Sequence, residues 1–340
     1  MILIIVDYTR HRDRGDINMK KAFLPVVLLL VLIVSACGGN KQEQSSSPSA
    51  SAAPESSAPA SSEAPSQEAS AGTVIYESEN GPVEIPANPQ RIIGLTNAPN
   101  IISLDGKLVG VDEWTKKNPL FADKTANVET VSDADLEKII ELDPDLIIAG
   151  SWMNNLDKMS EIAPTIVYTW GKLDYLAQQL EIGKLLSKEA ETQAWIDDFT
   201  SRAKAAGDEI KAKYGENVTV SVFEYDLKDV YVFGNNWARG TEILYQAMGL
   251  KMPAKVEQDA LEPGYYTLSQ EVVPEYAGDF IVLSKNKEGN GAFLDSETWK
   301  NIPAVKNNQV IEIDTEASSY SDPTTLEYLL DIFKKGFLGN

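Results

Sequence analysis

Short apolar runs alternate with helical segments along most of the chain, and this alternation constrains the fold more than any other feature. The segment 135–150, DLEKIIELDPDLIIAG, shows one such unit. Leu136, Ile139 and Ile140 have helical spacing, Pro144 ends the helix, and the following LII predicts a buried strand. Further strands are predicted at 91–95, 108–111, 165–168, 218–225, 229–233, 279–283 and 309–313, after a hairpin at 74–85. The pattern predicts an α/β fold with mainly parallel sheets.

A weak internal repeat indicates two similar lobes. Residues 137–148, EKIIELDPDLII, align without a gap with residues 271–282, EVVPEYAGDFIV. Each copy has a Glu near its start, a turn, an Asp and then an apolar strand. Because the copies occupy equivalent places in the two halves, we expect two lobes of similar construction.

A long helix is predicted between the lobes. Residues 174–215 are rich in helix formers and nearly free of Gly and Pro. We expect Ser187 to be the N-cap of a helix that runs to about Lys213, and roughly 26 residues would span about 39 Å. Such a helix is long enough to bridge both lobes. A shorter helix is predicted at 241–250, with Gly249 at its C-terminal end.

The N-terminal region has the features of a lipoprotein signal. Residues 19–37, MKKAFLPVVLLLVLIVSAC, combine two lysines, an apolar run and small residues before Cys37, the only cysteine. The order Val-Ser-Ala-Cys resembles the bacterial lipobox, in which the cysteine is acylated and becomes the first residue of the mature chain. The next 33 residues, 40–72, are mostly Ser, Ala, Pro, Glu and Gln, and they predict a flexible tether. We therefore expect a lipid anchor at the outer face of the cell membrane, with no other membrane attachment.

These observations divide the chain into five parts. They are an upstream extension and signal peptide at 1–36, the acylated cysteine and tether at 37–72, an N-terminal lobe at 73–173, a bridging helical region at 174–215 and a C-terminal lobe at 216–340.

Composition excludes several functions. The single histidine, His11, precedes the signal peptide, so histidine-based nucleophilic catalysis and histidine-rich metal sites are not expected in the mature protein. The net charge of −21 argues against nucleic acid as a partner. We expect no enzyme activity and no resident cofactor or metal.

Taken together, these segments resemble a known family of binding proteins. The lipobox, PQRIIGL, the E-x-I-x-x-L-x-P-D-L-I-I unit, the bridging helix and DPTTLEYLLDIF are similar to class III substrate-binding lipoproteins of ABC importers, the siderophore and cobalamin type. The stretch 231–250, YVFGNNWARGTEILYQAMGL, most resembles the ferric-hydroxamate siderophore binders. The resemblance implies a monomer with two α/β lobes, one rigid connecting helix, a ligand cleft between the lobes and little closure on binding. It also implies that the protein delivers a ferric siderophore to an ABC permease.

The resemblance places Trp237 and Arg239 in the cleft. A ferric trihydroxamate brings all six iron ligands, so the protein needs only aromatic surface and hydrogen-bond donors, and arginine is a suitable donor. Ligands bind at the carboxyl ends of parallel strands, which adds residues after predicted strands and before the last helix. These further candidates are Tyr231, Thr96, Asn97, Trp114, Ser151, Trp152, Met153 and Tyr320.

Charge favours hydroxamates over catecholates. Catecholate complexes are strongly anionic and call for a basic cluster, whereas the candidate cleft shows only Arg239, Lys116 and Lys117. We therefore expect a neutral or cationic hydroxamate complex.

The aligned glutamates Glu137 and Glu271 are candidates for contact with the permease. The resemblance implies one such glutamate on each lobe, docking onto arginines of the permease. A glutamate in the first turn of a helix is also favoured by the helix dipole alone.

Four alternatives stay open on the sequence alone. The same fold serves ferric catecholate, ferric citrate, haem and cobalamin binders. Asp143 and Asp145 are paired carboxylates that an enzyme would use for acid–base chemistry. Tyr265 and Tyr266 are candidates for direct Fe³⁺ chelation, and a tethered surface adhesin would also fit the N-terminal region.

Overall fold

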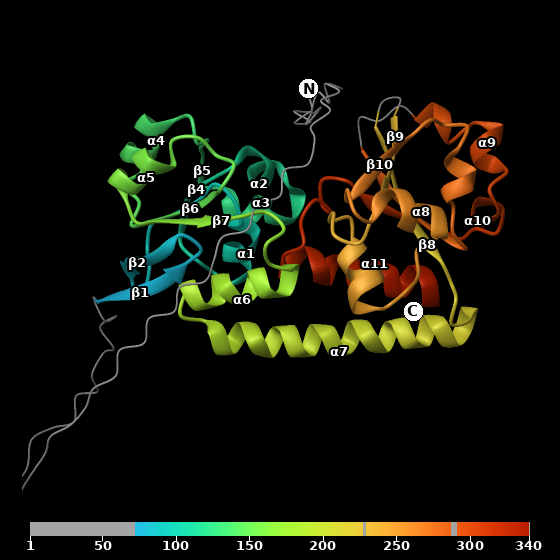
Figure 1. The fold of residues 1–340 in the computed structure, drawn as a ribbon, viewed down its shortest axis with the longest axis horizontal. Coiled ribbons are helices and arrows are strands. Elements are labelled where there is room, and N and C mark those ends of the chain that lie inside the picture. Colours follow the sequence, from blue (N-terminus) through green and yellow to red (C-terminus); the bar gives the residue numbers. More distant parts are fainter. Residues whose placement is uncertain (1–71, 227–228, 287–290, 340) are drawn as a thin grey trace, which may run out of the picture. The chain divides into compact units, whose positions relative to one another are not determined.

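The computed structural model describes residues 72–226, 229–286 and 291–339, and these residues form two lobes of α/β construction (Figure 1). The predicted signal peptide, Cys37 and nearly all of the tether lie outside the described residues. Within the described ranges, no helix combines the length and the apolarity that a membrane span requires.

The first lobe is built on a fully parallel sheet. Its strand order is β5-β4-β3-β6-β7. The strands are β3 (Ile92–Gly94), β4 (Leu108–Val111), β5 (Glu129–Thr130), β6 (Leu146–Gly150) and β7 (Thr165–Tyr168). The helices of this lobe are α1 (Ala98–Ser103), α2 (Glu113–Lys117), η1 (Pro119–Phe121), α3 (Ala122–Thr125), α4 (Leu136–Glu141) and α5 (Leu156–Ile162). β6 is buried along its whole length, as its continuous apolar run predicts.

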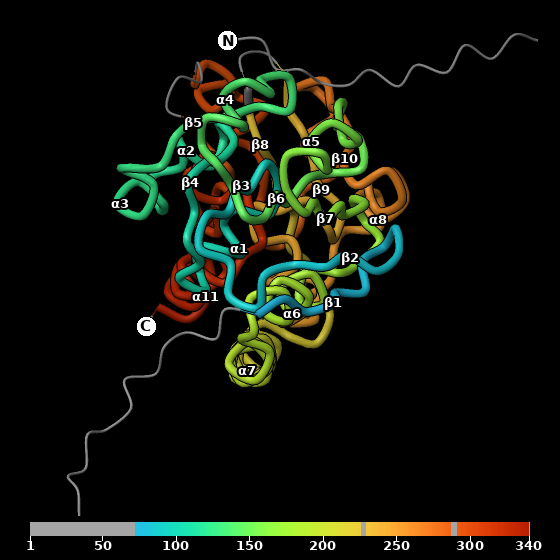
Figure 2. The backbone as a smooth tube through the Cα atoms, turned by 90° about the vertical axis from the view of Figure 1, so that its left-hand side faces the viewer, coloured from blue at the N-terminus to red at the C-terminus, as the bar shows by residue number. Residues whose placement is uncertain are grey.

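The predicted hairpin precedes this sheet. Strands β1 (Thr73–Ser78) and β2 (Gly81–Pro86) pair antiparallel and lie beside α6 (Tyr175–Leu185) in both views (Figures 1 and 2). The buried Tyr76 hydroxyl joins them, because it donates to Glu181 of α6 at 2.9 Å and lies 2.9 Å from the Tyr168 hydroxyl.

The second lobe has a mixed sheet in the order β10-β9-β8-β11-β12. The strands are β8 (Val220–Asp226), β9 (Asp229–Phe233), β10 (Tyr265–Leu268), β11 (Phe280–Lys285) and β12 (Val310–Asp314). β8, β11 and β12 run parallel, whereas β9 and β10 are antiparallel to their neighbours. The helices are η2 (Glu242–Ala247), α8 (Ala254–Ala260), η3 (Val273–Tyr276), η4 (Gly291–Phe293), α9 (Glu297–Lys300), α10 (Pro303–Lys306) and α11 (Pro323–Leu338).

The helix predicted at 241–250 has wider, π-helical hydrogen bonding over η2. The Met248 amide donates to the Ile243 carbonyl, five residues earlier, at 2.8 Å. The helix ends where predicted, since Gly249 has a left-handed φ of 66°.

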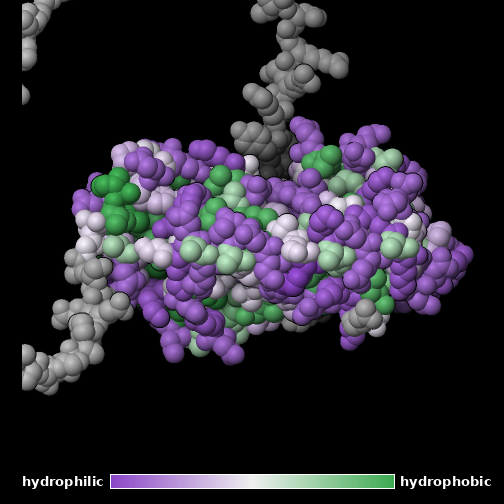
Figure 3. All heavy atoms as spheres, turned by 90° about the horizontal axis from the view of Figure 1, so that it is seen from below, coloured by the Kyte–Doolittle hydropathy of each residue, from purple (hydrophilic) through white to green (hydrophobic). Residues whose placement is uncertain are grey.

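The long helix is confirmed, but its predicted N-cap is wrong. α7 (Glu189–Tyr214) has 26 residues and packs on α6, η2 and α11, so that it joins the two lobes. Ser187 has φ 57° and lies in the connection between α6 and α7, and its hydroxyl donates to the Ala87 carbonyl at 3.0 Å. The residue at the N-cap is Lys188, which makes no side-chain cap. Figure 3 shows the face along α7, which hydrophilic side chains largely cover.

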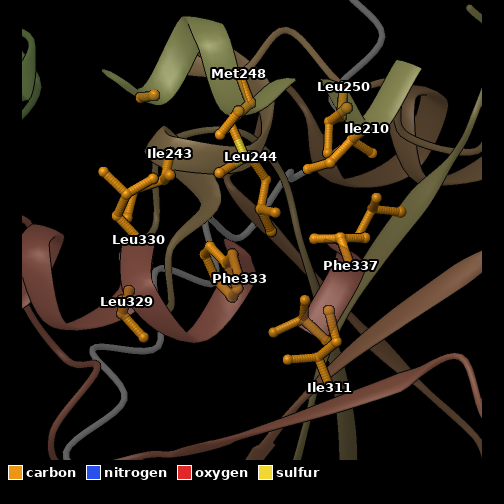
Figure 4. Close-up of a cluster of buried hydrophobic side chains, with 14 of the residues drawn as sticks. Ile210, Ile243, Leu244, Met248, Leu250, Ile311, Leu329, Leu330, Phe333 and Phe337 are labelled. Carbon is orange, nitrogen blue, oxygen red and sulfur yellow. The ribbon is translucent and has the colours of Figure 1, made fainter. Parts of the chain in front are cut away.

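The second lobe has a large apolar core between its sheet, α7, η2 and α11 (Figure 4). Ile210 of α7, Leu244 and Met248 at η2, and Phe333 and Phe337 of α11 point toward one another in this core. Gly207 lets α7 approach closely, because an added Cβ would lie 2.1 Å from the Met248 carbonyl oxygen. The connecting helix is therefore an integral wall of the second lobe.

The internal repeat has a structural counterpart. Asp145, just before β6, accepts hydrogen bonds from the backbone amides of Gln90 and Arg91 at 2.6 and 2.9 Å. Asp279, just before β11, accepts from the backbone amide of Thr219 at 2.8 Å. In each lobe the aspartate thus fixes the start of the neighbouring parallel strand, which is β3 or β8.

Candidate functional site

The two lobes enclose a cavity of about 210 Å³. From the first lobe it is lined by residues that follow β3, β6 and β7 and by the start of α6. From the second lobe it is lined by the loop 234–240, by Glu242 and by residues 319–321. The cavity therefore lies at the carboxyl ends of the first lobe's strands, as expected for an open α/β sheet.

Four of the predicted site residues line this cavity, and six do not. Thr96, Asn97, Trp152 and Tyr320 are in its wall. Trp237, Arg239, Tyr231 and Trp114 lie outside the lining, although Asn236 and Ala238, the neighbours of Trp237, belong to it. Ser151 and Met153 are also outside it.

Trp237 reaches the cavity through an aromatic row that connects the lobes. We define this row as Trp170, Trp237, Tyr265 and Tyr231. Trp170 lines the cavity from the first lobe and meets the Trp237 ring edge-on, with 6.2 Å between centroids. Trp237 then lies 5.0 Å from Tyr265, which lies 6.1 Å from Tyr231. Trp170 was not predicted, yet it follows β7 as Trp152 follows β6, so the same rule about strand ends would have found it.

Arg239 has a partner that the sequence did not indicate. Its Nε and Nη2 donate to the two carboxylate oxygens of Glu224 at 2.9 and 3.2 Å, and its guanidinium lies 5.1 Å from the centre of the Phe233 ring. Arg239 has a left-handed φ of 53°, and its backbone amide donates to the Ser318 carbonyl at 2.8 Å. The only sequence signal for Glu224 is an acidic residue within an otherwise apolar strand.

A hydrogen-bonded chain holds Glu224 at the carboxyl end of the second sheet. The Ser284 hydroxyl donates to Glu224 at 2.8 Å, and it lies 2.7 Å from the Thr315 hydroxyl. These residues come from β8, β11 and the end of β12, three adjacent parallel strands. Both lobes therefore gather polar side chains at the carboxyl ends of their parallel strands.

Two further carboxyl groups are buried beside the cavity. Glu242 accepts from the Ala238 amide at 3.1 Å and from the Thr241 hydroxyl at 3.1 Å, and burial raises its pKa above the ordinary value. Asp322 is the N-cap of α11, where it accepts from the Thr324 amide at 2.9 Å and the Thr325 hydroxyl at 2.6 Å. Burial also raises the pKa of Asp322. Asp322 thus caps the first turn of α11, whereas Glu242 binds the loop that precedes η2.

Tyr320 connects the lobes behind the cavity. Its hydroxyl lies 3.2 Å from the Thr115 hydroxyl and 3.5 Å from a carboxylate oxygen of Asp112, and burial raises the pKa of Tyr320. The Tyr320 ring packs edge-on against Phe121 of the first lobe at 6.0 Å. Close by, the Asn118 side chain donates to the Glu316 carbonyl at 2.7 Å.

The lysines considered as cleft cations point elsewhere. The Lys116 ammonium donates to the Val128 carbonyl at 2.9 Å and also contacts the Thr125 carbonyl. Lys117 pairs with Glu113 at 2.6 Å on the exposed face of α2. Of the described residues that line the cavity, none is a lysine or an arginine. Lys116 and Lys117, counted as candidate cleft cations from the sequence, therefore lie outside the lining of the cavity.

One buried donor in the lining has no partner. The Nε2 of Gln178 is the buried side-chain atom that makes no hydrogen bond within the described structure. A ligand that enters the cavity with an oxygen acceptor would satisfy it.

The structure argues against two of the alternatives. Tyr265 and Tyr266 point to opposite faces of β10, because Tyr265 packs on Trp237 whereas Tyr266 stacks on Tyr276 at 6.2 Å, so their hydroxyls do not converge on one iron ion. Asp143 has φ 45° in the turn before β6, and Asp145 binds the amides that precede β3. Neither aspartate lines the cavity, and the Asp145 carboxylate is taken up by backbone amides.

The predicted docking residues Glu137 and Glu271 are both exposed. Glu137 is in the first turn of α4, and Glu271 precedes η3. Within the described part of the chain, neither carboxylate makes an ion pair with Lys or Arg.

Comparison with known proteins gives a family, a relative and two solved structures. The family model of periplasmic binding proteins matches residues 98–317. The iron(3+)-hydroxamate-binding protein FhuD of Bacillus subtilis (strain 168) is 34% identical over 274 residues, which cover 78% of this chain and 87% of that protein. The solved structure of the FhuD protein from S. pseudintermedius has a TM-score of 0.72 at 34% identity, over 79% of this chain and 99% of that one. Staphylococcus aureus FhuD2 with bound ferrioxamine B has a TM-score of 0.69 at 32% identity, over 73% of this chain and 97% of that one.

Proposed function

Because this chain belongs to the family of periplasmic binding proteins, with FhuD-type proteins among its relatives, we propose that it captures a ferric hydroxamate siderophore outside the cytoplasm for an ABC importer. The observation that carries this proposal is the cavity between the lobes, with Trp152, Trp170 and Tyr320 in its wall and no lysine or arginine among its described lining residues. Aromatic surface suits the apolar body of a siderophore, and iron arrives already ligated. The protein then acts by binding rather than by catalysis, and it holds no resident metal or cofactor.

We propose that the Trp170–Trp237 contact opens when the ligand enters. A volume of about 210 Å³ is below the 300–1,000 Å³ that is typical of small-molecule pockets. The aromatic row joins the lobes at this cavity, and Trp170 is 68% exposed. We propose that the siderophore inserts between these two rings, with the Gln178 amide and Arg239 as donors to hydroxamate oxygens.

Tryptophan fluorescence of the full chain tests the proposal. Ferrioxamine B, ferrichrome, a ferric catecholate and ferric citrate would be titrated side by side. We expect saturable quenching by the two hydroxamates, and a loss of affinity of about tenfold or more in Trp170→Ala and in Trp237→Ala, since burying a large apolar side chain contributes about 1.5–3 kcal/mol. Trp114→Ala is the matched control, because Trp114 is similarly exposed, at 61%, but lies outside the lining. Saturable quenching by the ferric catecholate or by ferric citrate alone would mean that this complex, and not a hydroxamate, is the ligand. The absence of any saturable quenching would favour a surface adhesin.

Delivery and anchoring complete the proposed function. We propose that acylated Cys37 holds a monomer at the outer face of the membrane and that Glu137 and Glu271 contact the permease. Uptake of radiolabelled iron should be lost in the double variant Glu137→Ala/Glu271→Ala while ligand affinity is kept. The matched control is Glu161→Ala/Glu297→Ala, which removes one exposed carboxylate from each lobe at another place. Equal uptake by the two double variants would contradict the docking assignment.

A further inference from the structure

The ion pair between Arg239 and Glu224 has a consequence for ligand choice, given the proposed function. We propose that Glu224 determines charge specificity: it positions the Arg239 guanidinium and cancels its charge, so that the cleft takes neutral or cationic ferric hydroxamates and rejects anionic ferric complexes. Glu224 is a positioning residue in this proposal, because it acts on the ligand through Arg239.

The geometry fixes the guanidinium tightly. The Glu224 carboxylate accepts hydrogen bonds from two N–H groups of the guanidinium, at 2.9 and 3.2 Å. The centre of the Phe233 ring lies 5.1 Å from the central carbon of the guanidinium. Both side chains of the pair are largely buried, with exposures of 19% for Arg239 and 11% for Glu224. Within the described structure, Nη1 makes no hydrogen bond to a side chain. An arginine held in this way keeps donors for a ligand oxygen while most of its charge is compensated.

Glu224 is itself held by the sheet rather than by Arg239 alone. Ser284 donates to the carboxylate oxygen that also accepts from the Arg239 Nε, and Thr315 lies next to Ser284. The carboxylate is therefore fixed in place at the carboxyl end of the sheet, where ligands bind in α/β proteins.

Other carboxyl groups near the cavity do not replace Glu224 as the partner of Arg239. Glu242 lines the cavity and Asp322 lies beside it, and burial raises the pKa of both carboxyl groups. Lys116 and Lys117 are directed to other partners. Arg239 directly follows the lining residue Ala238, and Glu224 pairs with its guanidinium. Without Glu224, an uncompensated positive charge would face the ligand in a partly desolvated site, where charges interact strongly.

The test measures affinity for three ferric complexes of different charge. Ferrioxamine B is cationic, ferrichrome is neutral and ferric citrate is anionic. Dissociation constants for the full chain would be measured by fluorescence quenching at low and high salt. In Glu224→Gln, which keeps the shape of the side chain, we expect the ratio of the ferric citrate constant to the ferrichrome constant to fall by about tenfold or more. The ferrioxamine B constant should rise, and both changes should shrink at high salt.

Among the described residues, a second arginine–glutamate pair is a matched control. Arg202 and Glu327 lie 2.6 Å apart between α7 and α11. Neither is next to a residue that lines the cavity, whereas Arg239 directly follows Ala238 of the lining. Glu327→Gln should leave the affinity ratios unchanged. If Glu224→Gln alters all three constants by the same factor, the residue is only structural and the proposal is overturned. An unchanged ratio, or a wild-type preference for ferric citrate, would overturn it as well.

A second variant and the wild-type titration distinguish a failure of this inference from a failure of the proposed function. If Glu224→Gln does not fold, Ser284→Ala removes one hydrogen bond from the carboxylate without changing charge, and we expect a shift of the ratio in the same direction by about threefold. No shift in Ser284→Ala would then refute the role of Glu224. If the wild-type chain binds none of the three complexes, the proposed function fails and this inference fails with it. Binding of hydroxamates with no effect of either variant refutes this inference alone.

Discussion

Replacing Gly207 by alanine tests whether close backbone contact holds α7 to the second lobe. An alanine Cβ would lie 2.1 Å from the Met248 carbonyl oxygen and 2.7 Å from its carbonyl carbon and Cα. Backbone atoms of η2 cannot move aside as the end of a side chain can, so α7 or η2 must shift within a packed core. Such overpacking costs about 1–3 kcal/mol, and we expect the upper end of this range. Alanine also favours the helix by about 1 kcal/mol over glycine. The free energy of unfolding should therefore fall by about 2 kcal/mol.

Urea denaturation followed by circular dichroism measures this difference, with Gly336→Ala in α11 as the matched control. At Gly336 an added Cβ would meet atoms of the Ile311 side chain at 2.7 Å, and these can rotate or shift. Because the helix-forming gain is similar, we expect the control to stay within about 1 kcal/mol of the wild type. A Gly207→Ala chain that is as stable as the wild type, or no less stable than Gly336→Ala, would refute the reasoning.

Two further predictions concern carboxyl groups that bind the backbone. Burial raises the pKa of Glu242, so its contribution to stability is full below the ordinary glutamate pKa and is lost as pH rises through the raised value. The stability of the wild type relative to Glu242→Gln should therefore decrease from acid to neutral pH in urea titrations, and a constant difference would contradict this. Asp145→Ala and Asp279→Ala should each lower the free energy of unfolding by about 1.5–3 kcal/mol, because each removes a charged acceptor from strand-starting amides. The double variant should lose the sum, since the sites lie in different lobes, and a clearly smaller loss would indicate that the lobes unfold separately.

Most of the fold could be predicted because short apolar runs and helical spacing are local signals. β6 and β11 were recognisable from continuous apolar residues, and the aligned Asp145 and Asp279 hold equivalent strands in the two lobes. The break at Ser187 was missed because its left-handed backbone is tied to Ala87, which is distant in sequence.

The candidate site was predicted in part, for the same physical reason. Residues directly after parallel strands, such as Asn97 and Trp152, were found because strand ends meet at one edge of a sheet. Partners brought together by tertiary packing were not found. Glu224 pairs with Ser284 on the adjacent strand β11, Thr315 follows the next strand β12, and Trp170 meets Trp237 from the other lobe. No local pattern in the sequence encodes those distances.

The different strand directions of the two sheets have a consequence for how the chain folds. Every pair in the first sheet is parallel and needs a crossover, whereas β8 and β9 are consecutive antiparallel strands whose pairing extends to Asp226 and Asp229. Closing such a short loop loses little chain entropy, and local contacts form faster than distant ones. We therefore expect the second sheet to start forming from the pair of β8 and β9. The first sheet can form only after the crossover segments that connect its parallel strands have been ordered. The C-terminal lobe, which the ribosome synthesises last, is then expected to start folding faster than the N-terminal lobe.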